Sequence, residues 1–317
     1  MADSVKDFIA GTFGGWAQVF AGHPFDTLKV RLQTQGDPPK YRNAMDCLSK
    51  SIKEEGFQAL YKGATSPLLG VGVANAVLFT VHGFNLRTLG GGQSSDEMSI
   101  AQHFGAGALS GIAIAFVNCP VDLLKIRLQT QYTVKKRLKD GVAPPTTASG
   151  IIDKPRYTGV FDAATKITKA DGIRGLYRGL GICIVREIPS FAGYFGIYEL
   201  SKRLLAGSNP QEPLAAWQLL LAGGFAGIAA WLPCYPQDVL KSRIQSDTRN
   251  APIMEYVREI IKSGKGSYRG FFRGFGPTMV RAFPANAATF LTYELAIKAM
   301  QGTEPQKGAP RAALTAF

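Results

Sequence analysis

Cysteine and histidine are scarce in this chain of 317 residues, which contains four of the first and three of the second. The four cysteines stand far apart, and no pair has C-x-x-C spacing (Cys47, Cys119, Cys183, Cys234). This spacing favours neither a zinc site nor a disulfide framework. No nucleophile–base pair, metal-ligand cluster or phosphate loop is present either. We therefore expect no enzyme, no metal and no cofactor.

A recognisable N-terminal targeting signal is also missing. The segment MADSVKDFIAGTFGG shows neither an Arg-rich amphipathic presequence nor a signal-peptide cleavage pattern. We expect any targeting information to lie inside the chain.

Apolar residues are segregated along the chain, although the mean hydropathy of +0.02 is ordinary. They gather in six stretches, roughly 8–34, 64–90, 101–131, 180–205, 214–245 and 275–300. About 20 apolar residues suffice to cross a bilayer as a helix. A single stretch of this kind would also fit a buried helix of a soluble core. Six in succession with charged connectors predict an all-α membrane protein with six transmembrane helices.

The net charge of +13 would suggest nucleic-acid binding in a soluble protein, which is an alternative that requires solubility without detergent. The cations instead concentrate in the connectors after the first, third and fifth stretches (among them Lys40, Arg42, Lys50, Lys135, Arg137, Lys139, Arg249, Arg258, Lys262). A one-sided excess of cations is the positive-inside pattern. We therefore expect no nucleic-acid partner, and we expect both termini on the side opposite these connectors.

The chain repeats itself three times. The segments PFDTLKVRLQ (24–33), PVDLLKIRLQ (120–129) and PQDVLKSRIQ (236–245) share P-x-D-x-x-K-x-R. Each is followed by a segment closing on an aromatic residue, a cation and a glycine: EEGFQALYKG (54–63), ADGIRGLYRG (170–179) and GSYRGFFRG (266–274), the last without the acid. Each repeat then reads as two apolar helices joined by a basic amphipathic segment. The predicted units are 1–100, 101–210 and 211–317, the last including a C-terminal tail.

A proline inside a helix removes a hydrogen bond, so we expect the three prolines of the motif to bend their helices (Pro24, Pro120, Pro236). The aspartates and lysines that follow could form local pairs at spacing i, i+3 (Asp26 and Lys29, Asp122 and Lys125, Asp238 and Lys241). If the bent helices converge on a threefold axis, each Asp instead faces the Lys of the next repeat. Charges at membrane depth are costly unless paired, which favours this ring.

These motifs resemble the mitochondrial carrier family over essentially the whole chain. The resemblance implies the mitochondrial carrier fold with short matrix helices, a location in the mitochondrial inner membrane, and termini toward the intermembrane space. It implies that the Asp–Lys ring is a matrix gate that opens and closes during transport, and that cardiolipin binds at the closing glycines (Gly63, Gly179, Gly274). A solvated turn is the simpler alternative at these glycines. We expect a monomer.

The family pattern for a cytoplasmic gate is incomplete in this chain. The segment YELSK (198–202) fits it, YELAIK (293–298) has its cation one place late, and HGFNLR (82–87) lacks the aromatic residue and the acid. The candidate gate residues are Glu199, Lys202, Glu294 and Lys298. We predict a weak gate that opens easily toward the cytoplasmic side.

Asymmetry between the repeats points to a substrate site, because residues needed for the fold should recur. Seven residues after the closing glycines stand Gly70, Arg186 and Arg281, and Glu187 follows Arg186. Two cations and one anion suit a carboxylate joined to an amine or a quaternary ammonium group, although a structural Arg–Glu pair is the alternative. Asn75 and His82 complete the candidate set. His82 could take part in gating or could replace a hydrogen-bonding tyrosine.

The sequence thus predicts an antiporter-type secondary transporter for a small zwitterionic or basic amino-acid-like metabolite. The Arg–Glu pair on the fourth helix and the Arg on the sixth resemble the branch of carnitine/acylcarnitine, ornithine and basic amino-acid carriers. A carnitine/acylcarnitine exchanger is the first alternative. A membrane component with the carrier fold that does not transport is the second.

Overall fold

A computed structural model describes residues 2–35, 39–91, 97–131, 157–206, 218, 222, 225–227, 231, 233–247, 249, 251–264 and 266–301. All regular structure in this part of the chain is helical. The long helices are α1 (Ala2–Thr34), α3 (Thr65–Gly90), α4 (Ile100–Thr130), α6 (Leu180–Ala206) and α10 (Phe275–Gln301). The shorter ones are α2 (Ala44–Glu55), α5 (Val160–Asp171), α8 (Tyr235–Ser246) and α9 (Ile253–Ser263), with 3-10 turns η1 (Phe57–Tyr61), η2 (Ile173–Tyr177) and η3 (Tyr268–Phe272).

Three described stretches are long and apolar enough to cross a membrane: Phe57–Gly90, Ile100–Thr130 and Ile173–Leu205. The helices α1 and α10 are comparably long, with 33 and 27 residues, but glycine, proline and polar residues interrupt their apolar stretches. Of the stretch predicted at 214–245, the structure describes α8 continuously and only single positions before it.

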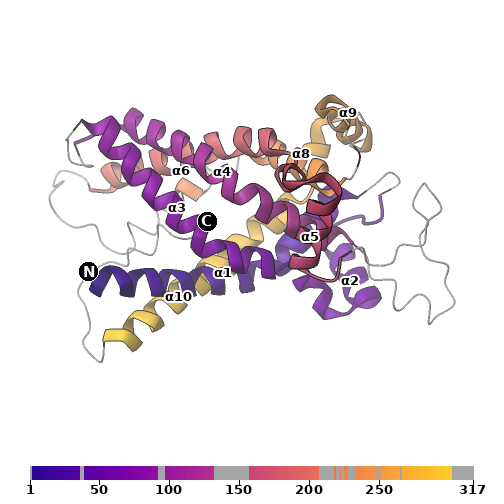
Figure 1. Cartoon of the computed structure of the whole chain (residues 1–317), viewed down its shortest axis with the longest axis horizontal. Coiled ribbons are helices and arrows are strands. Elements are labelled where there is room, and N and C mark those ends of the chain that lie inside the picture. The colour runs from indigo at the N-terminus through magenta and orange to yellow at the C-terminus, as the bar shows by residue number, and fades with distance from the viewer. Residues whose placement is uncertain are drawn as a thin grey trace.

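The long helices pack side by side, and the short helices gather at one end. Helix α1 lies along α10, and α4 lies between α3 and α6. Figure 1 shows α2, α5 and α9 at the end of the molecule opposite the N-terminus. Close packing of α4 on α6 depends on Gly107 and Gly111, because a Cβ at either glycine would lie within 2.6 Å of a backbone oxygen of α6.

The helices α2, α5 and α9 each pack, through an equivalent apolar cluster, on the helix that carries the motif of their repeat. In the first repeat Leu28, Leu32 and Leu60 surround Cys47 and Tyr41. The corresponding clusters place Leu124 and Leu128 against α5, and Leu240 and Ile244 against α9. These apolar positions alternate with the charged positions of the motif, so the same helical segment fixes the short helix on one face and presents its charges on the other.

The three motif prolines do not occupy equivalent places. Pro24 lies inside α1 and Pro120 inside α4, as expected. Pro236 instead stands at the start of α8, directly after a turn at 233–234. A proline is well tolerated in the first turn of a helix because the missing N–H has no partner there in any case. The expected bend inside a continuous helix is therefore replaced in the third repeat by a helix start.

Candidate functional site

The structure brings the six motif charges together in one ring, which we call the Asp–Lys ring. Lys125 Nζ lies 2.7 Å from Asp26, Lys241 Nζ 2.5 Å from Asp122, and Lys29 Nζ 2.5 Å from Asp238. Each pair joins two different repeats, so the local i, i+3 pairing is not the one adopted. The backbone after each proline turns the charged face of its helix toward the neighbouring repeat, while the apolar face holds the short helix.

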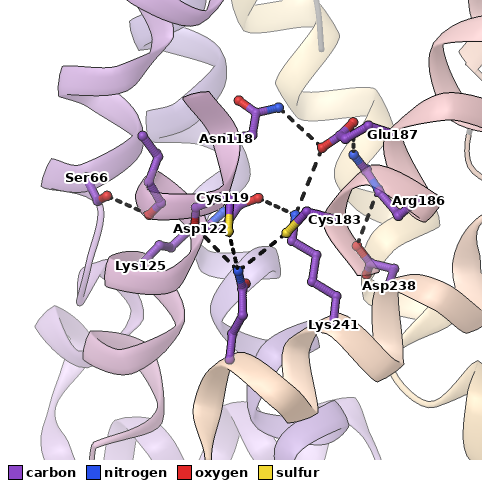
Figure 2. Close-up of polar contacts among 12 residues, drawn as sticks. Ser66, Asn118, Cys119, Asp122, Lys125, Cys183, Arg186, Glu187, Asp238 and Lys241 are labelled. Atoms are coloured by element: carbon purple, nitrogen blue, oxygen red, sulfur yellow. Dashed lines mark hydrogen bonds and ion pairs between the residues drawn. The ribbon is translucent and has the colours of Figure 1, made fainter. Parts of the chain in front are cut away.

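Arg186, Glu187 and Arg281 lie directly on this ring. Arg281 Nε is 2.8 Å from Asp26, and Arg186 Nε is 3.8 Å from Asp238. Figure 2 shows Arg186 between Glu187 and Asp238, with Lys241 and Asp122 beside them. Arg186 donates to Glu187 at 2.6 Å, and Glu187 is fully buried. Arg186 and Glu187 therefore link two of the ring pairs, because Lys241 Nζ also lies 4.0 Å from Glu187, whereas Arg281 adds a second cation to Asp26. We call the ring together with these three residues the charged network.

Two residues that contact this network were not predicted from the sequence. Asn118 donates to Glu187 at 3.3 Å (Figure 2). Lys29 Nζ lies 4.6 Å from the centroid of the Trp231 indole, and the Arg186 guanidinium lies 5.0 Å from it. Aromatic faces attract cations at such distances. Neither residue recurs in the other repeats, so the threefold pattern gave no signal for them.

Three glutamines brace the ring, and the pattern could have found them because Gln33, Gln129 and Gln245 recur four residues after each motif lysine. Gln129 donates to Thr27 at 3.1 Å, and Gln33 to Tyr235 at 3.3 Å and to Asp238 at 3.4 Å. Gln245 Nε2 lies 3.7 Å from the sulfur atom of Cys119 and 3.5 Å from that of Cys183. Each glutamine thereby adds a contact to another repeat beside a ring pair.

The closing glycines all adopt a left-handed backbone, with φ near +80° at Gly63, Gly179 and Gly274. Glycine is the residue that takes this conformation without strain. A Cβ at Gly63 would meet the carbonyl oxygen of Lys125 at 2.9 Å, and one at Gly274 would meet that of Lys29 at 3.1 Å. These turns therefore lie against the ring-bearing helices of the neighbouring repeats.

The remaining candidates of the substrate set lie on α3. Gly70 packs on Val121 of α4, and a Cβ there would come within 2.9 Å of a valine methyl group. Asn75 is half-buried. His82 is buried, stacks on Phe195 with ring centroids 3.6 Å apart, and lies 3.3 Å from Ser110 Oγ. None of these contacts joins the charged network, and a substrate role for the three stays a prediction.

At the other end of the molecule, Glu199 pairs within its own helix. It lies 3.1 Å from Lys202 and 3.0 Å from Arg203. Arg203 also donates to the carbonyl of Met98 at 2.5 Å, which ties α6 to the segment before α4. The side chains of Glu294 and Lys298 lie outside the described residues.

The first repeat carries a further buried ion pair where α1 meets α2. Arg31 donates to both oxygens of Glu55, at 2.7 and 3.2 Å, and Lys62 pairs with the same carboxylate. Burial alone would raise the pKa of the Glu55 carboxyl, but the charges of Arg31 and Lys62 lower it below its usual value. The connector is thus locked to the motif helix by a charged group that stays ionised.

Comparisons with known proteins agree with this architecture. The profile of the mitochondrial carrier protein family matches residues 2–91, 96–209 and 212–304. A "mitochondrial carnitine/acylcarnitine carrier-like protein" of Arabidopsis thaliana is 41% identical over 93% of this chain and 98% of its own length. The "mitochondrial basic amino acids transporter" is 39% identical in Rattus norvegicus, over 98% of this chain and 95% of its own, and 40% identical in Homo sapiens, over 94% and 91%.

The predicted all-helical carrier fold and the non-enzymatic transport function are confirmed by these matches. The three matched segments each contain one copy of the Asp–Lys motif, one short connector helix and one closing glycine. The chain belongs to the mitochondrial carrier family of membrane transporters.

Proposed function

We propose that this carrier exchanges a small zwitterionic or basic amino-acid-like metabolite across the mitochondrial inner membrane by alternating access. The observation that carries this proposal is that Arg186 and Arg281 each contact a ring aspartate. A substrate that engages these arginines therefore acts directly on the ring. We place the ring on the matrix side and both termini in the intermembrane space, in accordance with the positive-inside pattern.

The Asp–Lys ring serves as the matrix gate in this proposal. Its three pairs join different repeats, so the repeats cannot separate at this end while the pairs persist. Breaking a buried pair without a replacement leaves uncompensated charges in a low dielectric. The gate opens when the bound substrate supplies replacement contacts, which makes opening depend on substrate.

The charge of the network favours a substrate with a carboxylate. It contains five cations (Lys29, Lys125, Lys241, Arg186, Arg281) and four carboxylates (Asp26, Asp122, Asp238, Glu187). Asp26 is shared between Lys125 and Arg281, so a substrate carboxylate can take over Arg281 without leaving Asp26 unpaired. The planar guanidinium binds a carboxylate through two parallel hydrogen bonds.

Glu187 is the partner for the amine of the substrate. It is the one carboxylate of the network outside the ring, and it is already held by Arg186 and Asn118. When the substrate carboxylate draws Arg186 away, the released Glu187 attracts an ammonium group. The ion pair between Arg186 and Glu187 is thus replaced by two contacts with the zwitterion, one from Arg186 to its carboxylate and one from Glu187 to its ammonium group.

A specific observation favours carnitine or acylcarnitine as the second candidate. The Trp231 ring already attracts two cations in the network. Aromatic faces bind quaternary ammonium groups, which cannot donate hydrogen bonds. The relative from Arabidopsis thaliana carries carnitine/acylcarnitine in its name.

We also infer that cardiolipin binds at the closing glycines of a monomeric carrier. A cavity of about 400 Å³ lies between the two terminal repeats, lined by Arg42, Asn43 and Gly274 among others. It adjoins the first turns of α2 and α10, where backbone N–H groups favour anions. A lipid phosphate between repeats would support their contact at the gate end.

Counterflow in liposomes tests the proposed function. The purified carrier is reconstituted with each internal solute in turn, and uptake of labelled lysine, arginine, ornithine, histidine and carnitine is measured. We expect saturable uptake of at least one amino acid that requires an exchangeable internal solute. Uptake of carnitine alone would replace the first candidate by the second, and uptake of neither class would refute both.

Two substitutions locate the site in the same assay. Arg281→Gln and Arg186→Gln remove the proposed carboxylate contacts, and Arg87→Gln alters an exposed arginine of α3 as the matched control. We expect transport to fall at least tenfold in the first two variants and to stay at the wild-type rate in the third. Wild-type rates in the double variant of Arg186 and Arg281 would refute the assigned site.

A further inference from the structure

One position of the motif lies beside the charged network and differs in all three repeats. It stands four residues before each ring aspartate (Gly22, Asn118, Cys234). Residues four apart on a helix lie on the same face, so this position is one turn away from the ring. Cys234 keeps this relation just ahead of α8, because Asp238 N donates to its carbonyl at 3.0 Å. A position that varies while the ring recurs is a candidate for substrate selection.

The three residues at this position meet different parts of the proposed substrate site. A Cβ at Gly22 would lie 2.8 Å from Arg281 Nε, so the glycine leaves room for that guanidinium. Cys234 lies within electrostatic range of Glu187. Asn118 donates a hydrogen bond to Glu187 at 3.3 Å. Asn118 is therefore the member of this set that binds the proposed acceptor for the substrate amine.

The two oxygens of Glu187 have different partners. Oε2 accepts from Arg186 at 2.6 Å, whereas Oε1 accepts from Asn118 Nδ2 at 3.3 Å and lies 4.0 Å from Lys241 Nζ. A substrate carboxylate that draws Arg186 away therefore frees Oε2 and leaves Oε1 with its partners. Asn118 holds Glu187 in place while the ammonium group of the substrate replaces Arg186.

The Asn118 amide also has a hydrogen-bond acceptor, its carbonyl oxygen Oδ1. An ionised carboxylate only accepts hydrogen bonds, so the amide must present its nitrogen to Glu187. Figure 2 shows this orientation, with the nitrogen directed at Glu187 and the oxygen turned away. In the part of the chain that the structure describes, no group donates to this oxygen, and Asn118 is half-buried. The oxygen is thus an acceptor beside Glu187 for a donor from a ligand.

We propose that Asn118 is a specificity-determining residue that favours a substrate with a protonated primary amine. This inference rests on the proposed function, in which Glu187 binds the amine of the substrate. A primary ammonium group has three N–H donors, so it can donate to Glu187 Oε2 and to Asn118 Oδ1 together. A quaternary ammonium group carries the same charge but no donor, and it would leave Oδ1 desolvated without a hydrogen bond. Asn118 therefore opposes the preference for quaternary ammonium groups that the Trp231 ring would give.

Two ligands of equal charge test this preference. They are lysine and lysine fully methylated at both amines, which keeps both positive charges and has no N–H group. The rise in melting temperature of the full-length carrier in detergent is measured against the concentration of each, which gives the ratio of their affinities. We expect wild type to bind lysine at least ~10-fold more tightly and Asn118→Leu, which removes the amide at similar size, to bring the ratio close to one. Phe116→Leu, at an exposed position of α4, should keep the wild-type ratio.

The outcomes separate this inference from the proposed function. If Asn118→Leu weakens both ligands equally, Asn118 only orients Glu187 and the inference is overturned, whereas loss of lysine uptake in Arg281→Gln would still support the proposed site. A wild type that prefers the methylated ligand would overturn the inference as well. If Asn118→Leu does not fold, Asn118→Ala removes the same amide, and the same change in the ratio is expected. A wild type that neither binds nor transports any amino acid would refute the proposed function and the inference together.

Discussion

The two ends of this carrier hold their charges in different ways. At the ring end, three ion pairs each join two repeats, and two arginines of the central site add contacts to the same aspartates. At the opposite end, the described contacts of Glu199 with cations lie within α6. A pair between repeats resists their separation, whereas a pair within one helix moves with that helix. In the part of the chain that the structure describes, the ring end is therefore the end at which ion pairs hold different repeats together.

Removal of Asp26 should have the largest effect at the ring end. Asp26→Asn leaves Lys125 and Arg281 without their shared carboxylate, and an uncompensated buried charge costs about 3 kcal/mol or more. We expect transport in liposomes to fall at least ~100-fold. Asp122→Asn should cost less, because Asp122 pairs with one cation and its side chain is 31% exposed. Equal rates in wild type and Asp26→Asn would contradict the gate.

Loss of Glu55 should have the next largest effect, on stability. Glu55→Gln breaks the pair with Arg31 and should lower the free energy of unfolding by about 3 kcal/mol. Asp171→Asn changes the equivalent exposed position and serves as the control. Because the folded pKa of Glu55 lies below its unfolded value near ~4.3, its contribution is present above that pH and is lost as the pH falls through the folded pKa. The melting temperatures of wild type and Glu55→Gln, measured at several pH values, should therefore converge in acid.

Much of the ring was predictable because it follows from repetition. Three copies of one motif specify three equivalent helix ends, and a common axis then decides which Asp meets which Lys. Gln33, Gln129 and Gln245 recur in the same way and were open to the same argument. The substrate-site candidates were predictable where a charged residue stands in some repeats but not in all. Arg186 and Arg281 are such residues, because the first repeat has Gly70 at the equivalent position.

Other features depend on packing that no single position reveals. Trp231 belongs to the sequence 214–235, which contains no charged residue, so the composition around it resembles that of any apolar span. His82 occupies a place equivalent to Tyr198, yet the stacking on Phe195 and the contact with Ser110 depend on how α3, α4 and α6 meet. Pro236 stands at a helix start because the chain turns at 233–234, which the motif itself does not specify.

The glutamine braces should contribute less than the ion pairs that they accompany. Gln129→Leu removes hydrogen bonds to Thr27 and His23, and each neutral bond contributes about 1 kcal/mol. Gln245→Leu should cost less, because its contacts are long and two of them go to sulfur, a weak acceptor. Melting temperatures of the two variants should fall in that order, and the reverse order would show that the sulfur contacts carry more weight.

Glu199 provides the smallest expected effect and the sharpest test of the comparison between the two ends. Glu199→Gln removes two pairs within α6 whose cations are 27% and 34% exposed, and such pairs contribute less than about 1 kcal/mol. We expect transport to change less than ~10-fold, because the ion pairs that the structure describes for Glu199 lie within α6. Lys166→Gln, in an exposed pair of α5, sets the baseline for a pair within one helix. A loss at Glu199 as large as that at Asp26 would mean that this carboxylate acts in a closed state with a partner from another repeat, and the two ends would then be alike.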